Sequence, residues 1–205
     1  MTTPHDTFFK RLVTRIFTEK GSVIDIGGGL RIDPKRNNRY NPKNDWILPL
    51  ANAVSYKILD PVDTYNPDIV GDIHALPFAD GTQEAIVAIA VLEHVEDPLL
   101  ACREMHRVLA PGGFCFVYVP FLYYYHAEVG YYKDYWRFTH DSLPLLFKDF
   151  SHTEYVSVRG AFETILHLFP GGKSWPVRML GRGLDHLFSK GNSKQTSGYY
   201  LFAVK

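Results

Sequence analysis

Short apolar runs and amphipathic stretches alternate along this chain. Residues 5–19 carry apolar side chains at helical spacing, which predicts an amphipathic helix at the start. Further apolar runs predict seven strands, at residues 22–26, 54–59, 68–70, 84–92, 114–119, 153–158 and 199–204. Helices are expected from Pro98 to a stop at Pro111, and over residues 140–150, 162–169 and 175–188. Strands that alternate with helices indicate an α/β fold with a parallel sheet and right-handed crossovers.

Residues 30–49 interrupt this alternation. The segment holds the cations Arg31, Lys35, Arg36, Arg39 and Lys43 together with three prolines, and its helical signal is poor. It is predicted to be a long loop or a short irregular helix, and loops of this length in compact domains are often functional.

The composition argues against some classes of function but does not identify the activity. The 205 residues have a formal net charge of zero, so no long-range attraction to nucleic acid or anionic lipid is expected. The first 20 residues lack the apolar segment of a signal peptide, and no stretch is typical of a transmembrane helix. Cys102 and Cys115 make no disulfide framework, which favours a cytoplasmic protein in which both thiols are buried.

The stretch from Val23 to Gly29 carries the strongest functional signal. A β-branched run ends in Asp25 and three glycines, which indicates a buried strand that enters a turn where the backbone approaches a ligand. A dinucleotide-binding turn is one interpretation, but Ile32 stands where its third glycine is expected. The next strand-end acid, Asp60, lies 31 residues after Gly29, whereas about 20 residues are usual.

Five motifs in order give a second interpretation, and over residues 22–119 the chain resembles the class I S-adenosylmethionine-dependent methyltransferases of the type 11 branch. The motifs are Asp25-Ile26-Gly27-Gly28-Gly29, the strand-end Asp60, Gly71-Asp72-Ile73-His74-Ala75-Leu76-Pro77-Phe78, Ala90-Val91-Leu92-Glu93-His94-Val95-Glu96-Asp97-Pro98 and Arg107-Val108-Leu109-Ala110-Pro111-Gly112-Gly113-Phe114. The resemblance implies a Rossmann-like doubly wound, mostly parallel seven-stranded sheet with helices on both faces. It also implies S-adenosyl-L-methionine as the cofactor.

The same resemblance assigns the cofactor-binding residues. They are Asp25, Gly27, Gly28, Gly29, Asp60, Asp72, Ile73, Ala90 and Glu93. The chemistry agrees, since a carboxylate at Asp60 suits the ribose diol, Asp72 accepts from the adenine amine and the Ile73 N–H suits a ring nitrogen. The family pattern is broken at Leu30-Arg31, where Arg31 is either a contact to the cofactor carboxylate or a solvated loop residue.

An aromatic segment follows the fifth predicted strand. Half of the residues from Phe121 to Phe138 are aromatic, and the segment is similar to a stretch in a bacterial branch of these methyltransferases. It predicts a water-excluding lid over the acceptor, with Tyr125, Tyr135, Trp136 and Arg137 as substrate-binding residues; the alternative is plain core packing. His126 in this segment and His94 after the fourth strand are the candidate catalytic residues, His126 as a general base, and structural roles stay open for both.

These observations are consistent with one methyltransferase domain over residues 1–205, with an N-terminal helix (1–20), a cofactor-binding half (21–119) and an acceptor-side aromatic lid with C-terminal elements (120–205). The expected reaction is methyl transfer to an undefined small molecule with an O or N nucleophile, such as a sugar or natural-product intermediate. The alternative is a non-catalytic cofactor-binding or scaffold protein. Neither a bound metal nor a nucleic acid partner is expected; contact with a membrane surface is the less favoured interpretation of the apolar residues 162–188, and a homodimer is compatible with the sequence.

Overall fold

The computed structural model describes residues 3–33 and 40–205. Within these residues seven strands form one sheet in the order β3-β2-β1-β4-β5-β7-β6. The strands are β1 (Ser22–Ile26), β2 (Ser55–Asp60), β3 (Ile69–Val70), β4 (Gln83–Ile89), β5 (Leu109–Pro120), β6 (His152–Ser157) and β7 (Gly198–Val204). Neighbours among the first five pair in parallel, whereas β7 is antiparallel to both β5 and β6. The predicted mostly parallel Rossmann-like sheet is confirmed.

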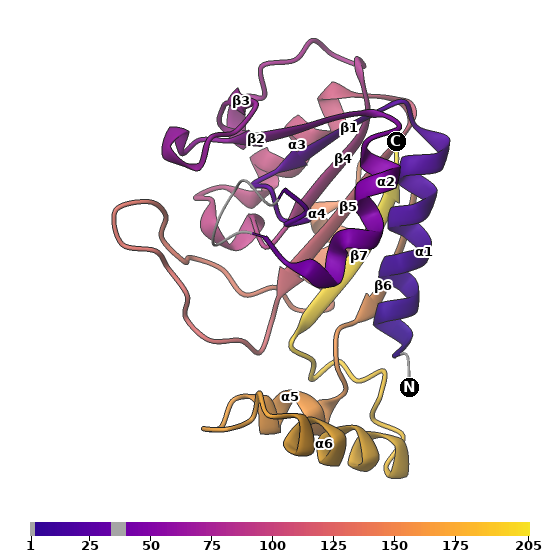
Figure 1. The fold of residues 1–205 in the computed structure, drawn as a ribbon, viewed down its shortest axis with the longest axis vertical. Helices are drawn as coiled ribbons and strands as arrows, with labels where there is room; N and C mark the ends of the chain where they lie inside the picture. Colours follow the sequence, from indigo (N-terminus) through magenta and orange to yellow (C-terminus); the bar gives the residue numbers. More distant parts are fainter. Residues whose placement is uncertain (1–2, 34–39) are drawn as a thin grey trace.

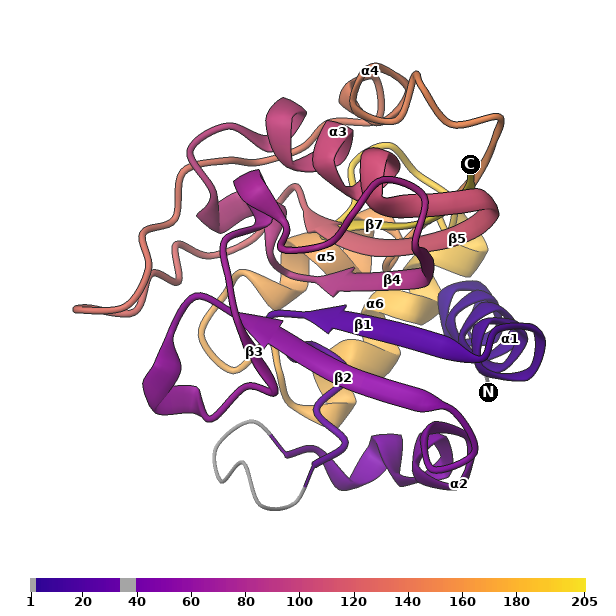
Figure 2. The same cartoon turned by 90° about the horizontal axis from the view of Figure 1, so that it is seen from above.

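Helices cover both faces of this sheet (Figure 2). The helical segments are α1 (Pro4–Glu19), η2 (Pro42–Ile47), α2 (Leu48–Ala51), η3 (Asp63–Tyr65), η4 (Ile73–Ala75), η5 (Leu92–His94), α3 (Pro98–Val108), α4 (Ser142–Leu146), α5 (Ala161–His167) and α6 (Trp175–Leu187). Buried residues of α1 and α2 form one apolar core with the sheet, and those of α3 and α4 form a second core on the opposite face. Because both faces are covered, the central strands are apolar on both sides.

The segment after β1 agrees with the predicted irregular structure. Its described part contains only the short helices η2 and α2. Leu30 and Ile32 are buried against the α1 side of the sheet, which anchors the beginning of the loop. Lys35, Arg36 and Arg39, three cations noted in this loop, lie outside the described residues.

β5 begins at Leu109 rather than at residue 114. Two further predicted boundaries differ from the structure by three residues or more. β4 ends at Ile89 rather than at residue 92, because Ala90 adopts a left-handed φ of 56° and the chain then forms the turn η5. The helix expected over residues 140–150 is reduced to α4, because in a helix that begins at residue 140 the ring of Pro144 would clash with the carbonyl of that residue. The earlier end of β4 positions the site, because η5 carries Glu93 and His94.

Helices α5 and α6 lie side by side at one end of the molecule (Figure 1). Several large apolar side chains on this pair are exposed: Ile165, Leu168, Phe169, Trp175, Met179, Leu180, Leu187 and Phe188. None of the helices in the described part of the chain has the length and apolar character needed to cross a membrane.

Candidate functional site

The three glycines form the turn that leaves β1. Gly27 and Gly28 have φ values of 76° and 61°, a region that side chains disfavour. A Cβ on Gly29 would lie 2.6 Å from the carbonyl oxygen of Ile89. The turn therefore needs glycine for backbone geometry at two positions and for close approach to β4 at the third.

Asp25 holds this turn from behind. Its side chain is fully buried, and its carboxylate accepts hydrogen bonds from the amides of Gly29 and Leu30, both at 3.0 Å. The hydroxyl of Tyr56 donates to the same carboxylate at 2.7 Å. Asp25 is not among the residues that line the adjoining cavity, and its described contacts hold the glycine turn.

A cavity of about 760 Å³ opens at the carboxyl ends of β1, β2 and β4. Most of the expected cofactor-binding residues line it: Gly27, Gly28, Gly29, Asp60, Asp72, Ile73 and Ala90. The expected residues that do not line it are Asp25, which lies behind the glycine turn, and Glu93, which lies beneath two histidines. The structure thus brings residues from four of the five motifs to one place.

Two acids define one side of this cavity. Asp60 is almost fully buried at the end of β2, and one of its carboxylate oxygens accepts from the Val62 amide at 2.9 Å. Asp72 caps η4 by accepting from the His74 amide at 2.9 Å, and its side chain is largely exposed. The backbone of this corner is therefore held by the same carboxylates that face the cavity.

Arg31 lines the cavity beside the glycine turn. Its backbone has a left-handed φ of 54°, and its side chain is exposed between the buried Leu30 and Ile32. The break in the family pattern therefore lies at the rim of the site, with an arginine directed to the cavity rather than to the core.

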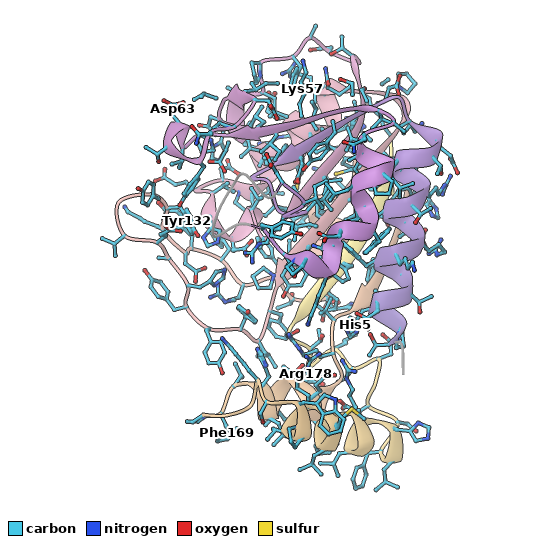
Figure 3. The ribbon with its side chains drawn as sticks, in the orientation of Figure 1. His5, Lys57, Asp63, Tyr132, Phe169 and Arg178 are labelled. Atoms are coloured by element: carbon cyan, nitrogen blue, oxygen red, sulfur yellow. The ribbon has the colours of Figure 1, made fainter. Side chains whose placement is uncertain are left out.

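The aromatic segment between β5 and α4 closes the other side of the cavity, and Figure 3 marks Tyr132 within it. The amides of Tyr135 and Trp136 both donate to the carbonyl oxygen of Glu93, at 2.7 and 3.2 Å. The Trp136 indole donates to the Val95 carbonyl at 2.9 Å. These contacts fix the lid on the loop that follows β4.

The four expected substrate-binding residues divide into two pairs. Tyr125 and Tyr135 line the cavity, whereas Trp136 and Arg137 do not. Arg137 instead makes a bidentate ion pair with Asp134, at 2.5 and 2.7 Å, and donates to the carbonyl of Tyr124. Burial alone would raise the pKa of Asp134, but the hydrogen bonds from Arg137 and from the His126 amide lower it to about 2. The ion pair stiffens the lid.

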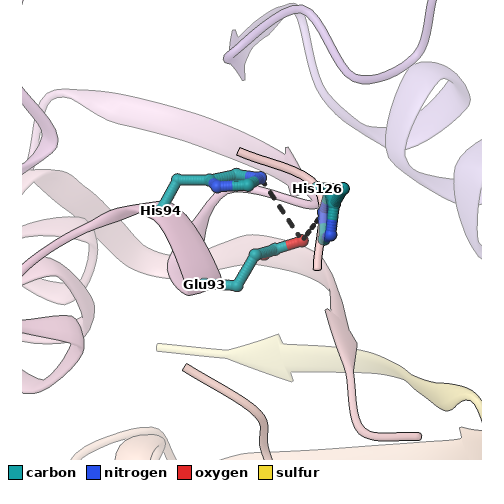
Figure 4. Close-up of side chains that lie close together, drawn as sticks. All are labelled: Glu93, His94 and His126. Carbon is teal, nitrogen blue, oxygen red and sulfur yellow. Dashed lines mark ion pairs between the residues drawn. The ribbon is translucent and has the colours of Figure 1, made fainter. Parts of the chain in front are cut away.

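Both candidate catalytic histidines lie at the cavity wall, close to each other and to Glu93 (Figure 4). The Nε2 atoms of His126 and His94 are 3.4 and 3.8 Å from one carboxylate oxygen of Glu93, whose side chain is fully buried. The neighbouring Glu93 carboxylate raises the pKa of His126. Sequence reasoning placed Glu93 with the cofactor; it did not predict that the three side chains converge.

A second cavity of about 400 Å³ adjoins the first through Tyr125 and His126, which line both. Its far wall is the turn between α5 and α6, from Phe169 to Lys173. The Lys173 ammonium lies 5.5 Å from the centre of the Tyr124 ring. Sequence reasoning missed this wall, because nothing in residues 162–188 indicates that they approach the lid.

Comparison with known proteins finds similarity to methyltransferases. A family model described as a methyltransferase domain matches residues 53–117. A segment of 44 residues is 49% identical to norajmaline N-methyltransferase from Rauvolfia serpentina, covering 22% of this chain and 15% of that enzyme. The curated relatives are matched over at most 21% of their own length.

Solved structures match over nearly the whole chain. A SAM-dependent methyltransferase from Archaeoglobus fulgidus superposes with a TM-score of 0.60 at 12% identity, covering 97% of this chain and 92% of that one. A protein from Thermotoga maritima, described as a possible histamine N-methyltransferase, gives 0.55 at 17% identity, with 97% and 95% covered. At these identities the likeness establishes the fold.

Proposed function

Because the chain belongs to the class I S-adenosylmethionine-dependent methyltransferases, we propose that it transfers a methyl group from S-adenosylmethionine to a small molecule that carries an oxygen or nitrogen nucleophile. The single observation that carries this proposal is the shared cavity. One side of it is lined by the glycine turn and two strand-end acids, and the opposite side is lined by an aromatic lid with two histidines. A donor and an acceptor can therefore meet inside one enclosure.

The donor occupies the side of the glycine turn. The cofactor is S-adenosylmethionine, and the carboxylate of Asp60 accepts from both ribose hydroxyls. Asp72 accepts from the adenine amine, and the Ile73 amide donates to a ring nitrogen. Arg31, where the chain departs from the family pattern, provides a charge-assisted contact to the carboxylate of the methionine part.

The acceptor occupies the side of the lid. Tyr125 and Tyr135 contribute apolar faces with hydroxyl groups, and Trp136 and Arg137 act on the acceptor by holding the lid in place. His94 and His126 stand where the nucleophile must approach the methyl group. Methyl transfer from a sulfonium is an in-line displacement, so alignment of donor and acceptor in a water-poor cavity supplies much of the rate enhancement.

The acceptor is best identified by measuring turnover with different classes of small molecule. Purified protein is incubated with methyl-labelled S-adenosylmethionine and, separately, with phenols, sugars and amines, and formation of S-adenosylhomocysteine is followed. One class is expected to turn over, and Asp60→Asn should reduce its rate at low cofactor concentration. Cofactor binding without turnover on every class would instead favour the non-catalytic alternative. A homodimer, a cytoplasmic location and the three-part division of one domain stay predictions.

A further inference from the structure

Three hydrogen-bond acceptors converge at the wall of the cavity. Both carboxylate oxygens of Glu93 are buried, and among the described residues neither has a hydrogen-bond partner within ordinary geometry. The Nε2 atoms of His94 and His126 face one of these oxygens. A buried carboxylate with no donor is costly unless a cation accompanies it.

The tautomers of both histidines follow from their other ring nitrogen. Nδ1 of His94 lies 2.7 Å from the carbonyl oxygen of Lys133, and Nδ1 of His126 lies 2.9 Å from that of Tyr124. A carbonyl oxygen only accepts, so each Nδ1 carries its proton and donates. In its neutral form, each imidazole therefore presents the lone pair of Nε2 to Glu93.

Histidines that ligate a metal commonly have this arrangement. Donation from the second ring nitrogen to a carbonyl or carboxylate fixes the ring and makes the ligand nitrogen more basic. Asp134, which lies 3.2 Å from Nδ1 of His126 and is itself bound by Arg137, supplies a further such contact. The lid thus orients the ring of His126 independently of Glu93.

The distances between the ligand atoms of these three side chains also suit coordination of one shared ion. One atom from each of Glu93, His94 and His126 can be chosen so that all three lie within 4.8 Å of one another. Two ligand atoms at about 2.1 Å from a tetrahedral ion lie roughly 3.4 Å apart, which is the His126–Glu93 distance. Nε2 of His94, the third ligand atom, lies 3.8 Å from the same oxygen of Glu93.

We propose that Glu93, His94 and His126 bind one divalent first-row transition metal ion, such as Zn²⁺ or Mn²⁺. Two imidazole nitrogens exclude Ca²⁺ and Mg²⁺ as preferred occupants, because those ions favour oxygen ligands throughout. Three protein ligands leave at least one coordination position open, and His94 and His126 both border the cavity. This inference revises the expectation that the chain binds no metal.

The open position also specifies the acceptor, a step that rests on the proposed methyltransferase function. It favours an acceptor whose hydroxyl oxygen binds the ion, since coordination lowers the pKa of a hydroxyl group. The hydroxyl proton passes to water, and the oxygen forms the new bond to the methyl carbon. The bond between that carbon and sulfur breaks, and its electron pair stays on sulfur.

Metal binding can be tested without any acceptor. Protein stripped with chelator is titrated with Co²⁺ and with Zn²⁺ by calorimetry, and the visible absorption of the Co²⁺ form is recorded. The variants are Glu93→Gln, His94→Gln and His126→Gln. The matched control is His74→Gln, because His74 also lines the cavity beside a carboxylate, that of Asp72, but lies outside the three-residue cluster.

Wild type and His74→Gln are expected to bind one ion per chain with micromolar or tighter affinity. Each cluster variant should bind at least tenfold more weakly and lose the Co²⁺ absorption bands. Thermal unfolding and S-adenosylhomocysteine binding, measured on the same samples, establish that a variant is folded and keep this test separate from the methyltransferase proposal. Absence of stoichiometric binding to the wild type, or unchanged affinity in Glu93→Gln and His126→Gln, would overturn the inference.

Discussion

The hydroxyl of Tyr56 donates a 2.7 Å hydrogen bond to the carboxylate of Asp25, across the pair formed by β1 and β2. The same carboxylate accepts the amides of Gly29 and Leu30. The shape of the glycine turn therefore depends on an acid that does not line the cavity. Tyr56 was not identified from the sequence, because a tyrosine in a strand gives no sign of its partner.

Substitutions of Asp25 and of Tyr56 should have unequal effects on stability and on cofactor affinity. Asp25→Ala leaves two buried amides without an acceptor, which should lower the free energy of unfolding by about 1–3 kcal/mol and weaken cofactor binding. Tyr56→Phe removes one hydrogen bond, should cost about 1 kcal/mol, and should leave cofactor affinity within about twofold. Urea unfolding and calorimetry on both variants measure these effects; equal losses of affinity would contradict the turn-holding role of Asp25.

The glycine turn gives a second prediction. In Gly29→Ala the new Cβ would meet the backbone of Ile89, and such overpacking typically costs about 1–3 kcal/mol. Because the glycine turn would have to move, binding of S-adenosylhomocysteine should be lost. The control is Gly112→Ala, where φ is 73° and no atom lies within 4 Å of the added Cβ. That variant should lose some stability and keep its affinity for the ligand.

The role of Arg31 can be tested by comparing two ligands, one with and one without the methionine carboxylate. If Arg31 contacts the methionine carboxylate, Arg31→Gln should weaken S-adenosylhomocysteine binding by roughly 1–3 kcal/mol. Binding of 5′-methylthioadenosine, which lacks that carboxylate, should not change. An equal loss for both ligands in competition binding would show instead that the substitution disturbs the turn.

Folding stability should decrease as the pH is lowered, because of His167. Its side chain is buried, neither ring nitrogen has a hydrogen-bond partner among the described residues, and burial lowers its pKa to about 4. Between about pH 6.5 and pH 4 the unfolded chain binds a proton that the folded chain does not, so folding stability decreases as the pH falls through this window. The loss attributable to this residue is up to about 3 kcal/mol.

Comparing urea unfolding of wild type and His167→Gln at pH 7 and pH 4.5 measures that loss. The difference in stability between the two pH values should be smaller in the variant. A parallel decline in both proteins would assign the acid sensitivity to other groups.

The sequence predicted the order of strands and helices well because apolar runs and helix caps act locally. Asp97 is an example: its carboxylate accepts from the Leu100 amide and starts α3 where predicted. The extent of β4 was predicted wrongly, because a non-glycine residue with positive φ, Ala90, ends it. The sequence alone does not show this backbone conformation.

Part of the candidate site could be predicted from the sequence. Residues at the ends of adjacent parallel strands must meet, so Gly27, Asp60 and Ala90 were expected together and do line one cavity. Glu93 and Arg137 were assigned to ligands, but the structure shows them beneath the histidines and in the lid. Their orientation depends on long-range contacts between the lid and η5, which no local pattern encodes.

The claim that S-adenosylmethionine binds at the glycine turn and Asp60 is tested most directly by calorimetric titration with S-adenosylhomocysteine. Wild type should bind one molecule per chain. Asp60→Asn should bind more weakly by about 1–3 kcal/mol, and Asp63→Asn, the same change at a nearby exposed acid outside the cavity, should bind like wild type. The absence of heat and of thermal stabilisation in the folded wild type, or equal affinity in all three proteins, would contradict the account.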